Sequence, residues 1–274
     1  MSNAITGLIG HPVKHSLSPR IHAHWLKKNN IEGSYELFDT APEALGIRVK
    51  ELRDADILGF NITVPHKQAV MEFLDEIDEV ASRIGAVNTV VNRKGKLHGT
   101  NTDAYGFITN LRNGLGNLDV FLEHVVILGA GGAARAAIVA LKDAGAKRIT
   151  IMNRTAKTAE DLAKEFNCET NHWAVHNTAP EGATLLVNTT SLGMQGKESL
   201  NIDIRPLADI AAVNDIVYAP LDTRLLEDAS EQGFASVDGL GMLLYQAQRA
   251  FALWHGIEPK VTGALRVHVL EKLT

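Results

Sequence analysis

A glycine-rich segment in the middle of the chain has the spacing of a turn that binds a dinucleotide. Gly129, Gly131 and Ala134 fit the pattern G-x-G-x-x-G/A directly after an apolar run at residues 125–128. The first glycine of this pattern permits a tight turn, the second lets the backbone approach a pyrophosphate, and the third small residue packs helix against strand. A helix that begins after the turn offers free N–H groups to the phosphates. The segment therefore predicts a nucleotide cofactor, although such turns also occur without a ligand.

Arg154 favours NADP over NAD as that cofactor. In NAD-binding units an Asp or Glu about 20 residues after the glycines holds the ribose 2′-hydroxyl. Here a second strand, predicted over 148–152, is followed by Asn153 and Arg154. A carboxylate would repel a 2′-phosphate, whereas a guanidinium can bind it through two hydrogen bonds. An ordinary solvated arginine is the alternative, and residues 156–158 hold no second arginine to complete a clamp, which leaves the strength of the preference open.

The composition predicts a soluble globular protein and excludes several other classes. The 274 residues suffice for two domains, with 45% apolar and 22% charged residues. A net charge of −5 gives no basic surface for nucleic acid, and the apolar runs are far too short to span a membrane. Cys168 is the only cysteine, and the N-terminus lacks signal-peptide features. A cytoplasmic protein without a metal site is expected.

Alternating strands and helices must position these residues. The predicted strands of the first hundred residues are 5–10, 34–38, 57–62, 86–91 and a hairpin partner at 96–98. Residues 103–113 predict a linking helix, and the later predicted strands are 125–128, 148–152, 184–188 and 214–218. A long helix over 239–254 is expected to pack back onto the first domain. The prediction is an α/β fold with one domain over 1–102, completed by 240–274, and a Rossmann domain over 103–239.

Two helix starts are predicted from capping patterns. Ser18 before Pro19 has the pattern of an N-cap followed by proline at the first helical position. Residues 40–43, Thr-Ala-Pro-Glu, have the pattern of a capping box and predict a helix to about Arg53. Residues 66–74 predict a further helix.

A series of short motifs makes the chain resemble the shikimate dehydrogenases over essentially its whole length. Besides the glycine segment they are 16–19 (Ser-Leu-Ser-Pro), 61–67 (Asn-Ile-Thr-Val-Pro-His-Lys), 85–89 (Gly-Ala-Val-Asn-Thr), 99–103 (Gly-Thr-Asn-Thr-Asp), 153–155 (Asn-Arg-Thr), 188–194 (Asn-Thr-Thr-Ser-Leu-Gly-Met) and 238–247 (Asp-Gly-Leu-Gly-Met-Leu-Leu-Tyr-Gln-Ala). Each motif alone is modest evidence, but all of them in this order are highly specific. The resemblance implies an N-terminal substrate domain and a Rossmann NADP domain, with the active site in the cleft between them.

The resemblance also implies a reaction and the residues that serve it. The family catalyses the reversible reduction of 3-dehydroshikimate to shikimate with NADPH, in aromatic amino-acid biosynthesis. The implied substrate-binding residues are Ser16 and Ser18 for the carboxylate, Thr63, Lys67, Asn88, Asp103 and Gln246 around the ring hydroxyls, Asn61 and Thr102 in the same pocket, and Tyr218 near substrate and nicotinamide. The implied cofactor-binding residues are Gly129, Ala130, Gly131, Gly132, Ala133, Asn153, Arg154, Thr155, Thr190, Ser191, Gly239 and Met242.

Lys67 and Asp103 are the implied catalytic residues. The substrate carbonyl oxygen must gain a proton as it becomes a hydroxyl, and a lysine ammonium in a partly dry site can donate one. A neighbouring carboxylate stabilises the ammonium, so Asp103 would orient Lys67 and couple the titration of the pair. Sequence does not decide which of the two moves the proton. Lys67 as a purely electrostatic stabiliser of the alkoxide is an alternative, and a surface salt bridge is another.

Several of these residues have ordinary structural alternatives. Ser18 is also a good N-cap, which makes Ser16 the safer carboxylate ligand. Asn61 and Asn88 are also turn formers. Gln246 could be a solvated helix residue and Tyr218 a core aromatic.

Two rival functions differ from the main hypothesis. A quinate/shikimate dehydrogenase that uses NAD would have the same fold, but an Asp at position 153 or 154 would then be expected. A non-catalytic NADP-binding regulator would have no need of Lys67 and Asp103. The oligomeric state is left open between monomer and homodimer.

Overall fold

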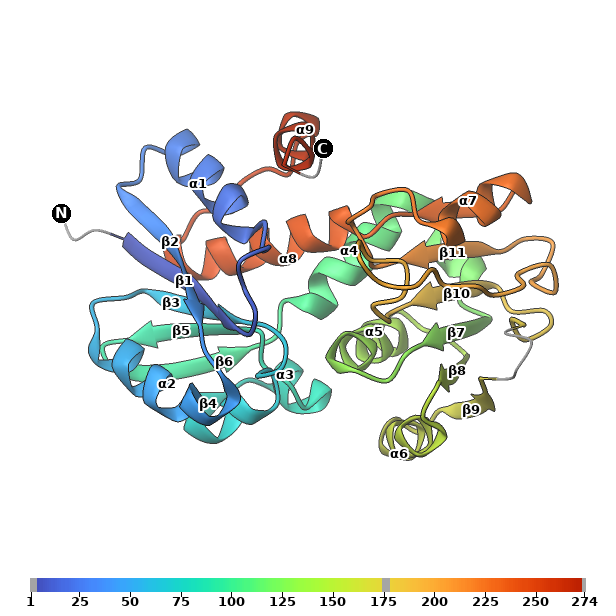
Figure 1. The fold of residues 1–274 in the computed structure, drawn as a ribbon, viewed down its shortest axis with the longest axis horizontal. Coiled ribbons are helices and arrows are strands. Elements are labelled where there is room, and N and C mark those ends of the chain that lie inside the picture. The colour runs from blue at the N-terminus through green and yellow to red at the C-terminus, as the bar shows by residue number, and fades with distance from the viewer. Residues whose placement is uncertain (1–3, 174–177, 273–274) are drawn as a thin grey trace. The chain divides into compact units, whose positions relative to one another are not determined.

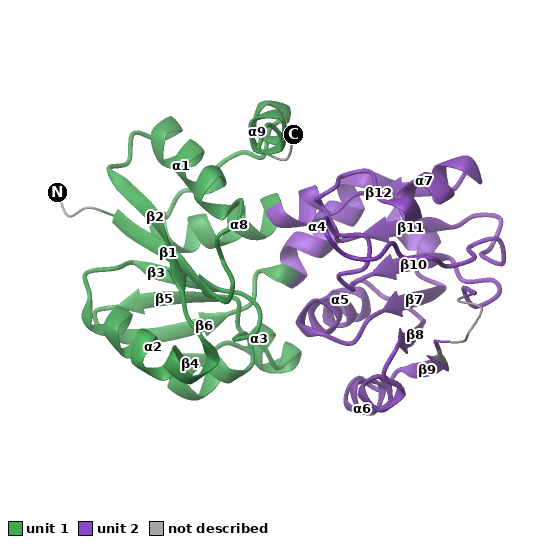
Figure 2. Cartoon of the chain, viewed as in Figure 1, with its two compact units in different colours: residues 1–103, 244–274 green, residues 104–243 purple. Residues whose placement is uncertain are grey.

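The chain forms two compact units in the computed structural model, which describes residues 4–173 and 178–272. Unit 1 comprises residues 1–103 and 244–274, and unit 2 comprises residues 104–243 (Figures 1 and 2). The divisions therefore fall at 103/104 and 243/244, where the sequence predicts them at 102/103 and 239/240. Each unit has its own sheet and its own buried core.

Unit 1 is built on a mixed sheet of six strands in the order β2-β1-β3-β5-β6-β4. The strands are β1 (Ala4–Gly10), β2 (Gly33–Asp39), β3 (Gly59–Ile62), β4 (Glu76–Ile77), β5 (Thr89–Arg93) and β6 (Lys96–Thr100). β1 runs parallel to β2 and β3, whereas β5 is antiparallel to β3 and β6. Gly95, at φ +86°, forms the predicted hairpin turn between β5 and β6.

Both faces of this sheet are covered, which explains its apolar strands. The helices of unit 1 are α1 (Ser18–Lys28), α2 (Leu45–Asp54), α3 (Glu79–Ile84), α9 (Gly263–Leu270) and most of α8 (Leu240–His255). Ile9 of β1 packs with Val49 of α2 in one buried cluster. The neighbouring Leu8 packs with Trp254 of α8 in another. Adjacent strand residues point to opposite faces, so α2 and α8 cover different sides of the sheet.

Both capping predictions in unit 1 are wrong. The N-cap of α1 is Leu17, and Ser18 is the first helical residue, because its own N–H already donates to Ser16 Oγ at 3.2 Å. Thr40 does not cap a helix either, since its hydroxyl donates back to the Phe38 carbonyl and a 3₁₀ turn (Pro42–Ala44) precedes α2. The predicted helix over 66–74 shrinks to a 3₁₀ turn at Ala69–Phe73.

Unit 2 contains an all-parallel sheet of six strands with doubly wound order. The strands are β7 (His124–Leu128), β8 (Arg148–Asn153), β9 (Glu169–His172), β10 (Leu185–Asn188), β11 (Ala212–Asp215) and β12 (Ala235–Val237). Their spatial order is β12-β11-β10-β7-β8-β9. Counted from β7, this is the 3-2-1-4-5-6 order of the Rossmann fold, whose ligands bind where the order reverses. That point lies between β7 and β10, which pair in parallel from Val125 with Leu185 to Leu128 with Asn188.

Helices flank the strands of unit 2 (Figure 1). They are α4 (Asp103–Leu115), a 3₁₀ turn (Leu118–Phe121), α5 (Gly132–Asp143), α6 (Ala156–Phe166), α7 (Arg224–Glu231) and the first turn of α8. The predicted strand over 214–218 ends early, at Asp215, so Tyr218 follows the strand instead of closing it. Within the described ranges, no helix is both long and apolar enough to cross a membrane.

Candidate substrate and cofactor sites

Polar side chains of unit 1 gather where several strands end at one edge of its sheet. β3 ends at Ile62 and β6 at Thr100, while the antiparallel β5 begins beside them at Thr89. The register pairs Asn61 with Thr89 and Thr89 with Thr100. This pairing brings the motifs 61–67, 85–89 and 99–103 to one edge, although they are distant in sequence.

Lys67 and Asp103 form a short ion pair at this edge. Lys67 Nζ lies 2.5 Å from Asp103 Oδ2, and the two side chains are 18% and 8% exposed. Asp103 Oδ1 accepts a second hydrogen bond from Asn88 Nδ2 at 2.8 Å. Asp103 is also the first residue of α4, where partial positive charge at the helix N-terminus favours a carboxylate. The pair therefore presents a largely desolvated ammonium that a fixed carboxylate holds in place.

Asn88 connects this pair to a buried polar network. Its Oδ1 accepts hydrogen bonds from the Thr102 N–H at 2.7 Å and from Thr89 Oγ1 at 2.9 Å. Its backbone carbonyl accepts from Asn61 Nδ2 at 3.0 Å. Asn61, Asn88 and Thr102 are all buried. Asn88 therefore hydrogen-bonds to several residues at this edge and holds the Asp103 carboxylate in place. This role goes beyond that of a residue that only forms a turn.

Tyr35 extends the network to Ser18 at the start of α1, and the sequence interpretation missed it. Its hydroxyl donates to Asn61 Oδ1 at 2.7 Å. Burial raises the pKa of this phenol, and a hydrogen bond with the Ser18 side chain opposes the shift. The signal that could have indicated Tyr35 is a phenol on a strand otherwise expected to face the core, because a buried hydroxyl needs a partner.

Of the remaining residues predicted to bind substrate, four belong to unit 1 and one, Tyr218, belongs to unit 2. Ser16 is half-buried and accepts from the Ser18 N–H, while Ser18 itself is buried. Thr63 is half-buried directly after β3, where its N–H donates to the Ile9 carbonyl at 2.9 Å. Gln246 is half-buried on the part of α8 that belongs to unit 1. Tyr218 belongs to unit 2, where burial raises the pKa of its hydroxyl.

The glycine turn of unit 2 follows β7 at the point where the strand order reverses. Gly129 has φ +105°, and a Cβ there would lie 2.7 Å from Thr189 Oγ1, so only glycine fits. Gly131 is the N-cap of α5, and a Cβ at that position would meet open space. Gly132 and Ala133 begin the helix, and Ala134 is fully buried against the sheet. Because no atom of the described residues lies close to the Cβ position of Gly131, the N-terminus of α5 has room for a pyrophosphate.

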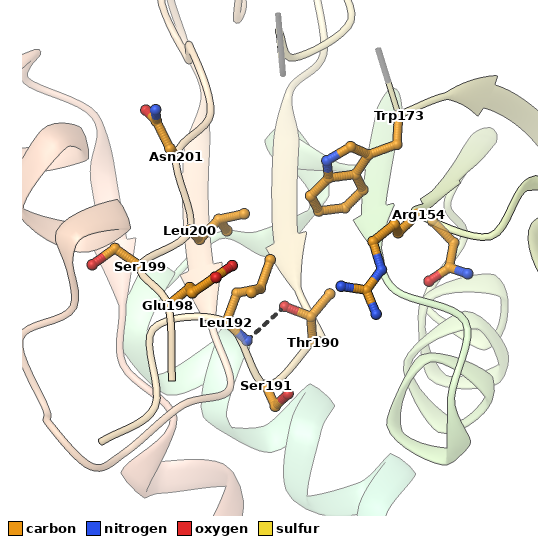
Figure 3. A pocket seen from close by; sticks show the side chains of 10 residues that line it. Arg154, Trp173, Thr190, Ser191, Leu192, Glu198, Ser199, Leu200 and Asn201 are labelled. Carbon is orange, nitrogen blue, oxygen red and sulfur yellow. Dashed lines mark hydrogen bonds between the residues drawn. The ribbon is translucent and has the colours of Figure 1, made fainter. Parts of the chain in front are cut away.

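Arg154 lines a pocket of about 390 Å³ beside this turn (Figure 3). The lining residues are Asn153, Arg154, Trp173, Thr190, Ser191, Leu192, Glu198, Ser199, Leu200 and Asn201. The guanidinium points into the pocket toward Thr190 and forms no ion pair with any residue that the structure describes. Thr155, also predicted for the cofactor, is the exposed N-cap of α6. An unpaired guanidinium in a pocket suits a phosphate group.

Trp173 and Glu198 were not predicted for this pocket. Trp173 packs partly on the core of unit 2, and its indole borders the pocket near Arg154 (Figure 3). No motif marks either residue, and their proximity to Arg154 depends on the pairing of β8 with β9 and on the loop after β10.

Gly239 and Met242, the last predicted cofactor residues, lie at the start of α8 in unit 2. A Cβ at Gly239 would lie 2.1 Å from the Ile216 carbonyl oxygen, so close backbone approach demands glycine there. Met242 is buried. The structure thus gives Gly239 a packing role.

Family models match three regions of the chain. Residues 8–90 match the shikimate dehydrogenase substrate binding domain, and residues 115–190 match shikimate/quinate 5-dehydrogenase. Residues 239–266 match the shikimate 5′-dehydrogenase C-terminal domain. The first and third matches fall mainly in unit 1, and the second falls in unit 2.

Known proteins resemble the chain over nearly its full length. A shikimate dehydrogenase (NADP⁺) of Paramagnetospirillum magneticum is 46% identical over 97% of this chain and 98% of its own length. The structure of the Thermus thermophilus shikimate 5-dehydrogenase, in complex with NADP(H) and shikimate, is 38% identical, with a TM-score of 0.87 over 99% of this chain and 100% of that one. A quinate dehydrogenase from Corynebacterium glutamicum, in complex with NAD, is 31% identical, with a TM-score of 0.90 over 98% of this chain and 99% of that one.

Proposed function

The chain belongs to the shikimate dehydrogenase family, and on that premise we propose that Lys67 and Asp103 carry the proton chemistry of its reaction. The enzyme is an oxidoreductase that reversibly reduces 3-dehydroshikimate to shikimate with NADPH. When bound, the cofactor supplies the hydride that converts the substrate carbonyl to a hydroxyl. The carbonyl oxygen gains the accompanying proton from Lys67, which Asp103 orients. The observation that carries this assignment is the 2.5 Å pair between two largely buried side chains.

The network around the pair supports a substrate pocket of mixed donors and acceptors. Shikimate carries a carboxylate and three hydroxyls, which need hydroxyl and amide partners. Ser16 and Ser18 bind the carboxylate in this proposal. Asn61, Thr63, Asn88, Thr102 and Gln246 contact or frame the ring hydroxyls. Tyr35 joins Ser18 to Asn61 and positions both.

The residues of unit 2 fit NADP. Gly129, Ala130, Gly131, Gly132 and Ala133 form the turn and helix start that can take the pyrophosphate. Asn153 ends β8, and Arg154 and Thr155 follow it. The Arg154 guanidinium, which pairs with no carboxylate among the described residues, supplies the charge that a 2′-phosphate needs. Thr190 and Ser191 line the same pocket as Arg154. Gly239 and Met242 are the remaining residues that we propose for binding the cofactor.

The NAD-dependent quinate dehydrogenase is the second candidate function. Its fold is as close to this chain as that of the NADP enzymes. Positions 153 and 154 argue against it. Asn153 accepts a hydrogen bond from a ribose 2′-hydroxyl more weakly than a carboxylate would. Arg154 attracts the 2′-phosphate, which NAD lacks.

The test is a spectrophotometric assay of the purified protein. Shikimate and quinate are each supplied with NADP or with NAD, and formation of the reduced cofactor is followed. We expect rapid turnover with shikimate and NADP, and little with the other combinations. Comparable activity with quinate and NAD would assign the broader dehydrogenase. A monomer or homodimer and a cytoplasmic location stay predictions, which light scattering and cell fractionation test.

A further inference from the structure

We propose that Asp215 is a positioning residue that fixes the turn at residues 190–192, and through it the NADP pocket. The proposal rests on the function proposed above for that pocket. Asp215 ends β11 and is fully buried. Among the described residues no cation pairs with it. A buried carboxylate without a cation is costly, so its presence calls for an explanation beyond packing.

Among the described residues, each partner of the Asp215 carboxylate is a hydrogen-bond donor. Oδ1 accepts from Asn188 Nδ2 at 2.9 Å and from the Val217 N–H at 3.0 Å. Oδ2 accepts from Thr223 Oγ1 at 2.8 Å. Burial raises the pKa of this carboxyl, and the three hydrogen bonds oppose the shift. The carboxylate thus ties together the end of β10, the segment that leads to Tyr218, and the residue before α7.

The contact with Asn188 sets the orientation of that amide. An ionised carboxylate only accepts hydrogen bonds, so the NH₂ group of Asn188 must face Asp215. The amide oxygen then faces the opposite way, where it accepts from the Thr190 N–H at 3.0 Å and from Thr190 Oγ1 at 2.7 Å. The same NH₂ group also donates to the Leu192 carbonyl at 3.2 Å.

The turn held in this way lines the pocket. Thr190 Oγ1 in turn accepts from the Leu192 N–H at 3.1 Å, the bond drawn in Figure 3. Thr190, Ser191 and Leu192 all border the pocket that contains Arg154. Loss of the Asp215 acceptor would leave the Leu192 carbonyl as the one acceptor for the Asn188 NH₂ group among the described residues, and would weaken the hold on the amide whose oxygen accepts from Thr190. The carboxylate itself lines no part of this pocket and acts through Asn188.

The experiment compares Asp215→Ala, Asp215→Asn and the control Thr223→Val. It measures the Kd for NADP without substrate, the KM values for NADP and shikimate, and the thermal midpoint. Asp215→Ala should raise the Kd and KM for NADP about tenfold, and change the KM for shikimate less than about twofold. Asp215→Asn should keep the Kd within about threefold, because its amide oxygen can accept both Oδ1 bonds and its NH₂ can donate to Thr223.

Thr223→Val removes a bond to the same carboxylate on the oxygen that does not contact Asn188. It should lower the thermal midpoint and leave the Kd for NADP unchanged. Unchanged NADP affinity in folded Asp215→Ala would overturn the proposal. So would an equal rise of both KM values, because that result indicates general destabilisation. If Asp215→Ala does not fold, Asn188→Ala takes its place with the same expectations.

The two proposals fail in different ways. If the wild type binds NADP but does not oxidise shikimate, the proposed catalytic roles fail while the comparison of Kd values still decides the role of Asp215. If the wild type does not bind NADP at all, the cofactor pocket is wrong and the role of Asp215 is overturned with it.

Discussion

At the scale of single residues, Lys67 is the side chain whose removal should affect the chemical step most. Lys67→Ala deletes the ammonium that Asp103 holds but leaves the Asn88 hydrogen bond to Asp103 in place. We expect kcat to fall about 10²–10⁴-fold, the range for a positioned acid–base group, with a smaller change in shikimate affinity. Steady-state kinetics and shikimate binding measure the two effects.

Lys50→Ala is the matched control for this variant. Lys50 is an exposed lysine on α2 of the same unit, and its removal should leave both kcat and KM unchanged. If folded Lys67→Ala retained turnover near the wild-type rate, the role assigned to Lys67 would be wrong.

Arg154 is the residue that we propose sets the choice between the two nicotinamide cofactors. Arg154→Ala should raise the KM for NADP about tenfold or more, and the KM for NAD much less, because only NADP carries the 2′-phosphate. Lys157→Ala provides the control, since Lys157 lies on the next helix but is 75% exposed and paired with Asp161. Equal effects of Arg154→Ala on both cofactors would contradict the assignment.

At the scale of elements, sequence predicts strands well and helix starts poorly. The apolar run at 125–128 and the small residues after it identify β7 and α5, because a buried parallel strand and a glycine turn leave direct compositional signals. Helix starts depend on which partner a side chain chooses. The Ser18 N–H donates to the Ser16 hydroxyl, and the Thr40 hydroxyl donates to the Phe38 carbonyl. Such local hydrogen bonds compete with capping, and the neighbouring sequence does not reveal which bond forms.

The contact of α8 with the sheet of unit 1 depends on Gly59. Trp254 Nε1 donates to the Val90 carbonyl at 3.0 Å, and a Cβ at Gly59 would lie 2.1 Å from that oxygen and 2.3 Å from that nitrogen. Gly59→Ala should therefore force α8 from the sheet and lower the free energy of unfolding by roughly 2–4 kcal/mol. Urea unfolding of the purified variant measures the loss.

Gly95→Ala separates this close contact from the general effect of replacing glycine. Gly95 has φ +86° and open space around its Cβ position, so alanine there costs only the left-handed backbone, about 1–2 kcal/mol. A loss in Gly59→Ala no larger than that in Gly95→Ala would show that the contact with Trp254 is easily relieved.

At the scale of the whole molecule, a buried histidine should set part of the acid sensitivity. His22 is fully buried, and its ring stacks on that of Tyr35 with 4.2 Å between the ring centroids. Neither of its ring nitrogens has a hydrogen-bond partner in the part of the chain that the structure describes. Burial, with a smaller contribution from His255, lowers the pKa of His22 from 6.5 to about 3. Tyr35 stays neutral because burial raises its pKa, and burial also lowers the pKa of His255.

The sign of the pH effect follows from these shifts. The unfolded chain binds the His22 proton below pH 6.5, whereas the folded chain binds it only near pH 3. Stability should therefore fall as the pH drops through this window, by at most about 1.4 kcal/mol per pH unit from this group. Urea unfolding between pH 7 and 4 should show a smaller loss in His22→Phe than in the wild type. Identical pH profiles would exclude the contribution of His22.

Site residues could be predicted from sequence where a motif lies at the end of a strand. They were missed where the hydrogen-bond partner is far away in the sequence. Lys67, Asn88 and Asp103 fall in separate motifs that the sheet of unit 1 brings to one edge. Tyr35 lies 26 residues from its partner Asn61, and Asp215 lies 27 residues from Asn188. These hydrogen bonds form only after the strands align, and no local sequence pattern around Tyr35 or Asp215 indicates them.

The division of unit 1 between the two ends of the chain sets an order of completion during synthesis. Ala250 and Trp254 cover Leu8, Val13 and Tyr35, yet they leave the ribosome about 150 residues after the first segment of the unit, roughly 8–30 s later at 5–20 residues per second. The contiguous cofactor unit is complete before then. The first sheet therefore keeps one apolar face uncovered until α8 has been synthesised, and during that interval this face is exposed to aggregation.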